Sequence, residues 1–462
     1  MSLIKSISGI RGTIGGAPGE GLTPIDVVRF TAAFASVIKE QTGKAKIKIV
    51  IGRDARISGA MVRDLVVGTL SGMGVDVIDL DLSTTPTVEV AVPAEKADAG
   101  IILTASHNPK QWNALKLLNG KGEFISGEEG QRVLELAEKD AFSFAEVDDL
   151  GTYTKDDSWL QKHIDAILAM PLVDVEAIRA KNFSVACDCV NSTGGIFVPA
   201  LLEALGVTQV HKLFCDPTGH FPHNPEPLPE HLTDLAGLIK EKGVDLGIVV
   251  DPDVDRLAFV CEDGSMFGEE YTLVAVADYI LSQTPGNTVS NMSSTRALRD
   301  VTEKHGGTYK ASAVGEVNVV AMMKDTNAII GGEGNGGIIF PELHYGRDAL
   351  VGIALFLTHL AKKDMSISAL RASYPNYAMS KNKIQLEEGM DVDGILSQMA
   401  TKYASLNPTT IDGVKIDFEN EWVHLRKSNT EPIIRIYSEA PTASAADELA
   451  QRFMKELMEI AK

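Results

Sequence analysis

Cysteine is scarce in this chain, and long apolar runs are missing. The four cysteines among 462 residues, Cys187, Cys189, Cys215 and Cys261, lack the paired C-x-x-C spacing of a zinc site. Four thiols cannot staple a fold of this size, so we interpret them as reduced core thiols. The N-terminal MSLIKSISGI has no apolar signal core, and no stretch approaches the ~18 apolar residues of a membrane span. The sequence therefore predicts a cytoplasmic protein that does not enter a membrane.

Positive charge is also in short supply. The chain carries 43 Lys and Arg against 63 Asp and Glu, a formal net charge of −20. A general nucleic-acid partner is disfavoured, because phosphate-backbone binding needs an excess of cations. Any anionic ligand has to meet a local cluster of basic residues.

The length predicts three or four domains, and the hydrophobic pattern predicts their type. Val- and Ile-rich runs such as 46–54, 100–109 and 244–256 are each followed by a Gly-containing or polar loop, and several then by a helical stretch such as 23–41, which Thr23 would cap. This alternation favours βα units and parallel sheets, whereas extended segments and a helical tail after about residue 370 favour α+β structure. We predict α/β domains at 1–155, 156–256 and 257–368, and a smaller α+β domain at 369–462.

The sharpest local signal is DPDVDR (251–256) at the end of an apolar strand. Asp251, Asp253 and Asp255 place three carboxylates at alternate positions, which suits one hard divalent cation. A solvated acidic loop is the alternative. An EF-hand is disfavoured, because Arg256 stands where that loop needs Gly and a strand leads into the motif.

TASHNP (104–109) places Ser106 where another apolar strand gives way to a loop. This serine is either a nucleophile or a turn-stabilising residue, since no G-x-S-x-G elbow occurs and the adjacent His107 is not thereby aimed at the hydroxyl. Lys116, ten residues on, is either a catalytic cation or a solvated strand residue.

Two further loops suit sugar and phosphate ligands. GGEGNGG (331–337) contains a formal G-x-G-x-x-G, but the following IIFPEL leaves no room for a Rossmann helix, so Glu333 and Asn335 instead suit sugar hydroxyls or an ordinary turn. RKSNTEP (426–432) gathers two cations, two hydroxyls and an amide, which favours a phosphate cup over a capped turn.

Together with SGIRGT (8–13) and GRDARISG (52–59), these segments resemble the α-D-phosphohexomutase family, in its order and spacing along nearly the whole chain. The resemblance implies a heart-shaped enzyme of four domains, three α/β and one smaller α+β, with one loop per domain in a central cleft. It implies that a phosphorylated Ser106 interconverts hexose 6-phosphate and hexose 1-phosphate through a hexose 1,6-bisphosphate. This reaction needs a metal and cations around the moving phosphoryl group.

The resemblance also assigns roles to residues. Ser106 and the three aspartates would hold Mg²⁺, while Glu333 and Asn335 would bind sugar hydroxyls. The phosphate cup would consist of Arg426, Ser428, Asn429 and Thr430. The reacting centre around Ser106 would consist of Arg11, Lys116, Arg256, His107 and Asp348.

Departures from the family pattern leave two questions open. Gly337 stands where many members have His, so Lys116, His107 and His344 all remain candidates for proton transfer. The T-E-P ending of the 426–432 loop resembles the glucosamine branch, which favours phosphoglucosamine mutase over phosphomannomutase or phosphoglucomutase. A catalytically silent sugar-phosphate sensor is the alternative of another class, and both a monomer and a homodimer are compatible with the sequence.

Overall fold

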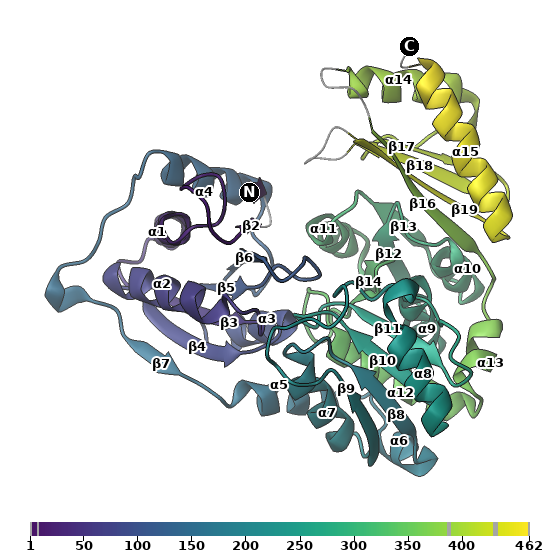
Figure 1. Cartoon of the computed structure of the whole chain (residues 1–462), viewed down its shortest axis with the longest axis horizontal. Helices are drawn as coiled ribbons and strands as arrows, with labels where there is room; N and C mark the ends of the chain where they lie inside the picture. The colour runs from purple at the N-terminus through teal and green to yellow at the C-terminus, as the bar shows by residue number, and fades with distance from the viewer. Residues whose placement is uncertain (1, 7–8, 386–389, 428–432, 461–462) are drawn as a thin grey trace. The chain divides into compact units, whose positions relative to one another are not determined.

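The computed structural model describes residues 2–6, 9–385, 390–427 and 433–460, and it divides into two compact units (Figure 1). The first unit comprises Met1–Tyr279 and Asn335–Leu370, and the second comprises Ile280–Gly334 and Arg371–Lys462. No helix in the described residues is long and apolar enough to cross a membrane.

The first unit begins with a seven-stranded sheet in the order β1-β2-β6-β5-β3-β4-β7. Its strands are β1 (Leu3–Ser6), β2 (Gly9–Thr13), β3 (Lys48–Arg53), β4 (Asp76–Leu82), β5 (Ala99–Leu103), β6 (Trp112–Asn119) and β7 (Tyr153–Lys155). Its helices are α1 (Pro24–Thr42), α2 (Gly59–Gly72), α3 (Thr85–Ala94) and α4 (Gly127–Glu138). Thr23 caps α1 as predicted, in a capping box with Asp26.

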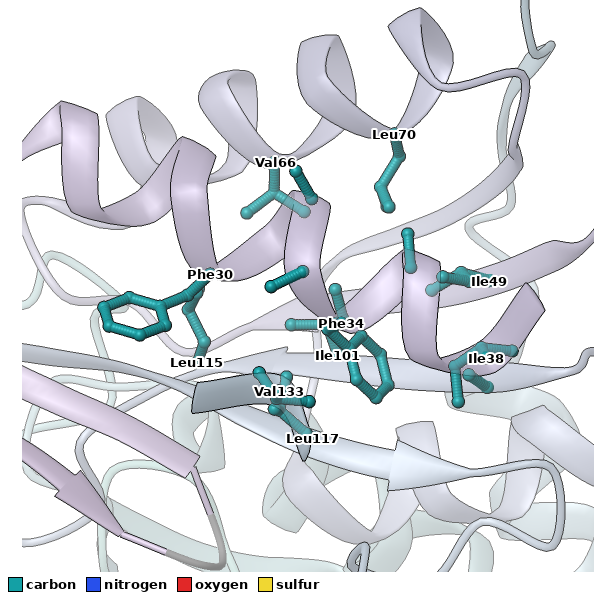
Figure 2. Packing of buried hydrophobic residues seen from close by; sticks show 14 of the residues in the cluster. Phe30, Phe34, Ile38, Ile49, Val66, Leu70, Ile101, Leu115, Leu117 and Val133 are labelled. Atoms are coloured by element: carbon teal, nitrogen blue, oxygen red, sulfur yellow. The ribbon is translucent and has the colours of Figure 1, made fainter. Parts of the chain in front are cut away.

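Helices α1, α2 and α4 bury apolar side chains against this sheet. Figure 2 shows Phe30 and Phe34 of α1 beside strand residues such as Ile101 and Leu115. Strand β5 is buried along its whole length and β3 along its centre, because the sheet is covered by helices. The ends of these strands carry the loops with chemistry.

A second sheet, in the order β11-β10-β8-β9, completes the strand framework of the first unit up to residue 279. Its strands are β8 (Ser184–Asp188), β9 (Gln209–Leu213), β10 (Leu246–Val250) and β11 (Leu257–Cys261). The remaining α-helices that lie wholly in this unit are α5 (Trp159–Leu168), α6 (Val175–Lys181), α7 (Gly194–Ala204), α8 (Thr233–Lys242) and α12 (Ala349–Lys363). Helices α9 (Glu269–Gln283) and α13 (Ile367–Ala372) begin in the first unit and end in the second. The short strand β15 (Gly337–Ile339) also belongs to the first unit's sequence.

The second unit contains parallel strands β13, β12 and β14, in that order, and an antiparallel sheet in the order β16-β19-β18-β17. The strands are β12 (Asn287–Asn291), β13 (Tyr309–Ser312), β14 (Ala328–Glu333), β16 (Ala378–Gln385), β17 (Val414–Asp417), β18 (Trp422–Lys427) and β19 (Ile433–Ala440). The helices are α10 (Ala297–Lys304), α11 (Glu316–Thr326), α14 (Val392–Lys402) and α15 (Ala443–Ile460). The predicted change to α+β structure after residue 370 is confirmed, and the sheet there is antiparallel.

The α/β fold class is confirmed, but the two sheets of the first unit are mixed rather than parallel. Strand β6 is antiparallel to β5, and β11 is antiparallel to β10. In both places a short loop of about ten residues or fewer returns the chain directly, and such a loop cannot make a helical crossover. Because of this, β11 shares a sheet with β10, although it follows the boundary we placed after residue 256. The four-domain division itself stays a prediction.

Candidate active site

Ser106 lies just beyond the end of β5, in a loop that one buried arginine holds together. Arg56 donates NH1 hydrogen bonds to the carbonyls of Pro109 and Trp112 at 2.8 and 2.9 Å, and its NH2 binds the carbonyls of Ser106 and Asn108. Asp54 pairs with the Arg56 Nε at 3.0 Å, so the guanidinium is neutralised where it is buried. The loop is therefore a rigid support for the serine.

The backbone of Ser106 is itself strained. Its φ is +49°, in the left-handed region that L-residues other than Gly rarely adopt. The backbone N–H of Ser106 donates to Thr104 Oγ1 at 2.9 Å, which helps to hold that conformation. Strain of this kind persists only where surrounding contacts impose it, and it concentrates at functional sites.

The Ser106 hydroxyl points to the acidic loop after β10. Its Oγ donates to Asp251 Oδ2 at 2.7 Å, across 145 residues of sequence. The other oxygen, Asp251 Oδ1, accepts the backbone N–H groups of Asp255 and Arg256 at 3.2 and 3.1 Å. The structure thus brings the serine loop 104–109 into contact with the acidic loop 251–256.

Asp251, Asp253 and Asp255 are fully buried, and one carboxylate oxygen from each lies within 4.8 Å of the others. Burial, followed by the charges of Asp253 and Asp255, raises the pKa of Asp251 well above its usual range. Three buried carboxylates repel one another unless positive charge lies among them.

Two basic side chains supply part of that charge. Lys116 Nζ lies 2.7 Å from Asp253 Oδ2 and 3.2 Å from Asp255 Oδ2, and Arg347 NH2 lies 2.6 Å from the same Asp255 oxygen. Burial opposes the charge on Lys116, but Asp253 and Asp255 outweigh it and raise the pKa of its ammonium. Lys116 therefore stays cationic in this arrangement.

The remaining oxygens fit a hard metal ion. Asp253 Oδ1 and Asp255 Oδ1 are buried and have no hydrogen-bond partner in the part of the chain that the structure describes. Buried unpaired carboxylate oxygens are costly, whereas Mg²⁺ prefers such oxygens and keeps further positions for water or phosphate. The cluster thus fits a metal site, and its donors favour a hard divalent cation.

Arg11, Arg256 and His107 lie around the same loop. Arg11 NH1 is 3.4 Å from Asn108 Oδ1, and burial together with the charge of Arg256 lowers the pKa of Arg11. Arg256 NH1 is 3.2 Å from Glu226 Oε1 and its Nε is buried without a partner in the described residues. Two guanidiniums that destabilise each other are suited to an anion between them.

The His107 ring lies beside the nucleophile. His107 Nδ1 is 3.4 Å from Ser106 Oγ. Burial and the nearby charge of Arg256 hold the pKa of His107 well below its usual range, so the ring is neutral at physiological pH.

Asp348 occupies a separate buried network. Its Oδ2 lies 3.1 Å from His163 Nε2 and 3.2 Å from His344 Nε2, while its Oδ1 accepts the backbone N–H groups of Leu350 and Val351 at the start of α12. The structure shows no direct contact between this carboxylate and Ser106 among the described hydrogen bonds. Its neighbour Arg347 contacts the acidic cluster instead.

The other predicted residues divide between the units. Asn335, in the first unit, accepts the Gly337 N–H at 3.2 Å. Glu333, in the second, accepts Asn291 Nδ2 at 2.8 Å and the Gly315 N–H at 3.2 Å. In the second unit, Arg426 Nε lies 2.9 and 2.8 Å from the two oxygens of Asp412. The predicted cup residues Ser428, Asn429 and Thr430 lie outside the described residues.

Sequence reasoning missed Arg347, which lies one residue before the predicted Asp348. A side chain at Gly337 would place its Cβ 2.3 Å from Arg347 Cδ, so the stem of Arg347 fills the space that the glycine leaves. The signal was present, because Gly337 had already been recognised as a departure from the family pattern. The sequence does not reveal that Arg347, ten residues later, occupies the space beside Gly337.

Sequence reasoning also missed Thr85, at the first position of α3. Its Oγ1 donates to Asp253 Oδ2 at 2.5 Å, and its backbone N–H donates to the Asp253 carbonyl at 2.9 Å. A lone Thr at a helix N-terminus carries no sequence signal of this role.

Comparison with known proteins defines the class of protein first. Models of the phosphoglucomutase/phosphomannomutase alpha/beta/alpha domains I, II and III match residues 3–144, 161–264 and 268–377, and that of the C-terminal domain matches 378–456. The protein is thus a phosphohexose mutase, an isomerase of carbohydrate metabolism that acts on sugar phosphates. The chain belongs to the α-D-phosphohexomutase family.

Individual relatives cover nearly the whole chain. A phosphoglucomutase/phosphomannomutase of Thermococcus kodakarensis is 35% identical over 98% of this chain and 99% of its own. A probable phosphoglucosamine mutase of Methanopyrus kandleri is 31% identical over 97% of this chain and 96% of its own. The crystal structure of a phosphoglucomutase/phosphomannomutase family protein from Burkholderia thailandensis is 26% identical, with a TM-score of 0.84 over 99% of this chain and 97% of that one.

Proposed function

We propose that this mutase interconverts glucosamine 6-phosphate and glucosamine 1-phosphate through phosphorylated Ser106 and a bound 1,6-bisphosphate. The observation that carries the chemistry is the Ser106 hydroxyl, held 2.7 Å from Asp251 among carboxylates and cations drawn from distant segments. A phosphoryl group on Ser106 Oγ would meet the charges of Lys116 and the two arginines Arg11 and Arg256. Such preorganised charge stabilises the transferring group.

Each half-reaction balances without an external reagent. The bond between phosphorus and Ser106 Oγ breaks as a bond forms between phosphorus and a sugar hydroxyl oxygen, and that hydroxyl loses its proton. We assign proton transfer to His107, because its ring alone among the three candidates is in contact with Ser106 Oγ. Lys116 is held by Asp253 and Asp255, and His344 lies in the network of Asp348 and Glu89. Return of the second phosphate to Ser106 reverses these steps.

Asp251, Asp253 and Asp255, with the Ser106 oxygen, would hold Mg²⁺. The ion would act as a Lewis acid that offsets charge on the phosphoryl group. Lys116 remains paired with Asp253 and Asp255, and Arg347 with Asp255, during phosphoryl transfer. These ion pairs offset the repulsion among the carboxylates of the acidic loop.

The preference for glucosamine rests on the T-E-P sequence at 430–432 and on Glu333, a carboxylate able to pair with an ammonium group at C2 of the sugar. The competing function, phosphoglucomutase/phosphomannomutase, is favoured by the name of the Thermococcus kodakarensis relative. Substituents at C2 alone distinguish these sugars, a difference of about 1–3 kcal/mol, so side activities are expected.

Two measurements test this function. Intact-mass analysis after incubation with glucose 1,6-bisphosphate should show one added phosphate, which Ser106→Ala removes and Ser397→Ala, on the exposed face of α14, retains. A protein that never gains the phosphate is a silent sensor rather than a mutase. The kcat/KM values for glucosamine, glucose and mannose phosphates then decide the substrate, and a higher value for glucose or mannose refutes the glucosamine assignment.

A further inference from the structure

Three of the four cysteines lie together at one edge of the second sheet. Cys187 lies near the end of β8, and Cys189 is the first residue after that strand. Cys215 lies two residues after the end of β9. Because β8 and β9 are parallel neighbours, their carboxyl ends meet at the same edge. Residues separated by 26 positions in sequence therefore become neighbours.

The distances between the sulfurs suit one shared ion. Cys187 Sγ and Cys215 Sγ are 3.8 Å apart, and all three sulfurs lie within 4.8 Å of one another. Thiolates bound to one ion at about 2.3 Å lie about 3.8 to 4.0 Å apart, whereas disulfide sulfurs are bonded at about 2.05 Å. The Cys187–Cys215 distance is that of two thiolates on one ion, and Cys189 Sγ lies close enough to be a third ligand.

The surroundings provide both access and compensating charge. Cys187 and Cys189 are buried, but Cys215 is partly exposed and leaves a path to solvent. The first turn of α7 lies close to the thiols, because a Cβ at Gly195 would be 2.1 Å from the Cys215 carbonyl and one at Gly194 would be 3.5 Å from Cys189 Sγ. A helix N-terminus favours thiolate over thiol. Contact with Cys187 and Cys215, together with burial, raises the pKa of Cys189 well above its usual range, so metal binding has to displace that proton.

We propose that Cys187, Cys189 and Cys215 form a three-thiolate site for one soft metal ion, Zn²⁺ or Cu⁺. Binding releases the thiol protons to solvent and needs no oxidant. Soft thiolates select these ions, whereas the all-oxygen Asp251 cluster selects hard cations, so the two sites bind different metals.

The site has a structural role. Ser192 and Thr193, which follow Cys189 closely, donate from their hydroxyls to the Pro252 carbonyl at 2.7 and 3.0 Å. An ion that fixes Cys189 and Cys215 stabilises the loop from which these hydroxyls reach the acidic motif. Its loss is expected to lower thermal stability rather than to remove a reacting group.

Titration of the full-length, reduced, metal-free protein with Cd²⁺ tests the proposal, because the thiolate-to-cadmium charge-transfer band reports sulfur ligands only. Excess Mg²⁺ is present to occupy the carboxylate cluster. We expect one Cd²⁺ per chain, metal-dependent protection of the partly exposed Cys215 from a thiol reagent, and a rise in the melting temperature. Competition by Zn²⁺ or by Cu⁺ then identifies the preferred ion.

Cys215→Ser should weaken the apparent affinity by about ten-fold or more, since even indirect ligand support contributes that much. Cys261→Ser is the matched control, because Cys261 is buried in β11 outside the cluster, and it should retain the band. Should Cys215→Ser fold poorly, the stoichiometry and thiol protection of the parent protein decide. The absence of the band in the parent protein, an unchanged Cd²⁺ affinity in Cys215→Ser, or a Cys187–Cys215 disulfide forming in place of bound metal would each overturn the proposal.

Discussion

The charge on His344 makes a prediction about stability that can be worked out quantitatively. His344 is buried, with Nδ1 3.3 Å from Glu89 Oε2 and Nε2 3.2 Å from Asp348 Oδ2. Burial disfavours the imidazolium, but its bonds to Asp348 and Glu89 outweigh that effect and raise the pKa of His344 to about 10. Gly346 permits this approach, because a Cβ there would lie 1.9 Å from Glu89 Oε2.

The sign follows from proton binding. In the unfolded chain His344 titrates near 6.5, so between about pH 7.5 and 9 the folded protein holds a proton that the unfolded chain has lost. The stabilisation is complete below pH 6.5 and is lost as the pH rises through about 10. The slope is about 1.4 kcal/mol per pH unit, so about 2 kcal/mol of unfolding free energy disappears between pH 7.5 and 9.

The perturbation is His344→Gln, which keeps a hydrogen-bonding side chain and removes the titration. At pH 7.5 it should destabilise the first unit by about 3–5 kcal/mol, because Glu89 and Asp348 lose their shared cation. By pH 9 this deficit should shrink by about 2 kcal/mol. His220→Gln, at an exposed histidine, is the control and should follow the parent profile.

Urea unfolding at both pH values measures the effect. Trp112 and Trp159 lie in the first unit and Trp422 in the second, so tryptophan fluorescence reports the unfolding of both. Variants that lack the tryptophan of one unit separate the two transitions. If the free energies of the parent and of His344→Gln change in parallel between pH 7.5 and 9, His344 is not a buried imidazolium and the reasoning is refuted.

Four further predictions concern catalysis. Ser106→Ala should abolish turnover and leave the unfolding transition nearly unchanged, and near-normal kcat would contradict the covalent mechanism. Asp253→Asn should raise the Mg²⁺ concentration needed for half-maximal activity, whereas full parent activity in EDTA would exclude the metal site. Arg347→Ala should reduce kcat/KM by about ten-fold or more, since a charge-assisted hydrogen bond of ~1.5–3 kcal/mol is lost, and an unchanged kcat/KM would show that Lys116 suffices. Arg426→Ala should raise KM by about ten-fold and release free 1,6-bisphosphate during turnover, with Ser106 phosphorylation much less affected, and unchanged KM and release would place the phosphate cup elsewhere.

Local chemistry let the sequence predict the elements and the loops of the reacting centre. Thr23 and Pro24 predicted where α1 begins, because a cap and a fixed φ act within one turn. The alternate spacing of Asp251, Asp253 and Asp255 predicted a clustered set of carboxylates, because these residues share one short loop. Ser106 was expected at a strand end, and the structure places it directly beyond β5.

The partners of those residues depend on folding, since no rule of spacing joins segments far apart in the chain. Ser106 meets Asp251 across 145 residues, and Arg347 meets Asp255 across 92, because separate strands end at neighbouring places. The cysteines show the same limit: their spacing argued against a metal site, and only parallel pairing of β8 and β9 brings Cys215 to Cys187. The sequence by itself determined which side chains are available and which local turns hold them. The tertiary structure decided which charges are buried together, and burial gives each group its pKa and its partner.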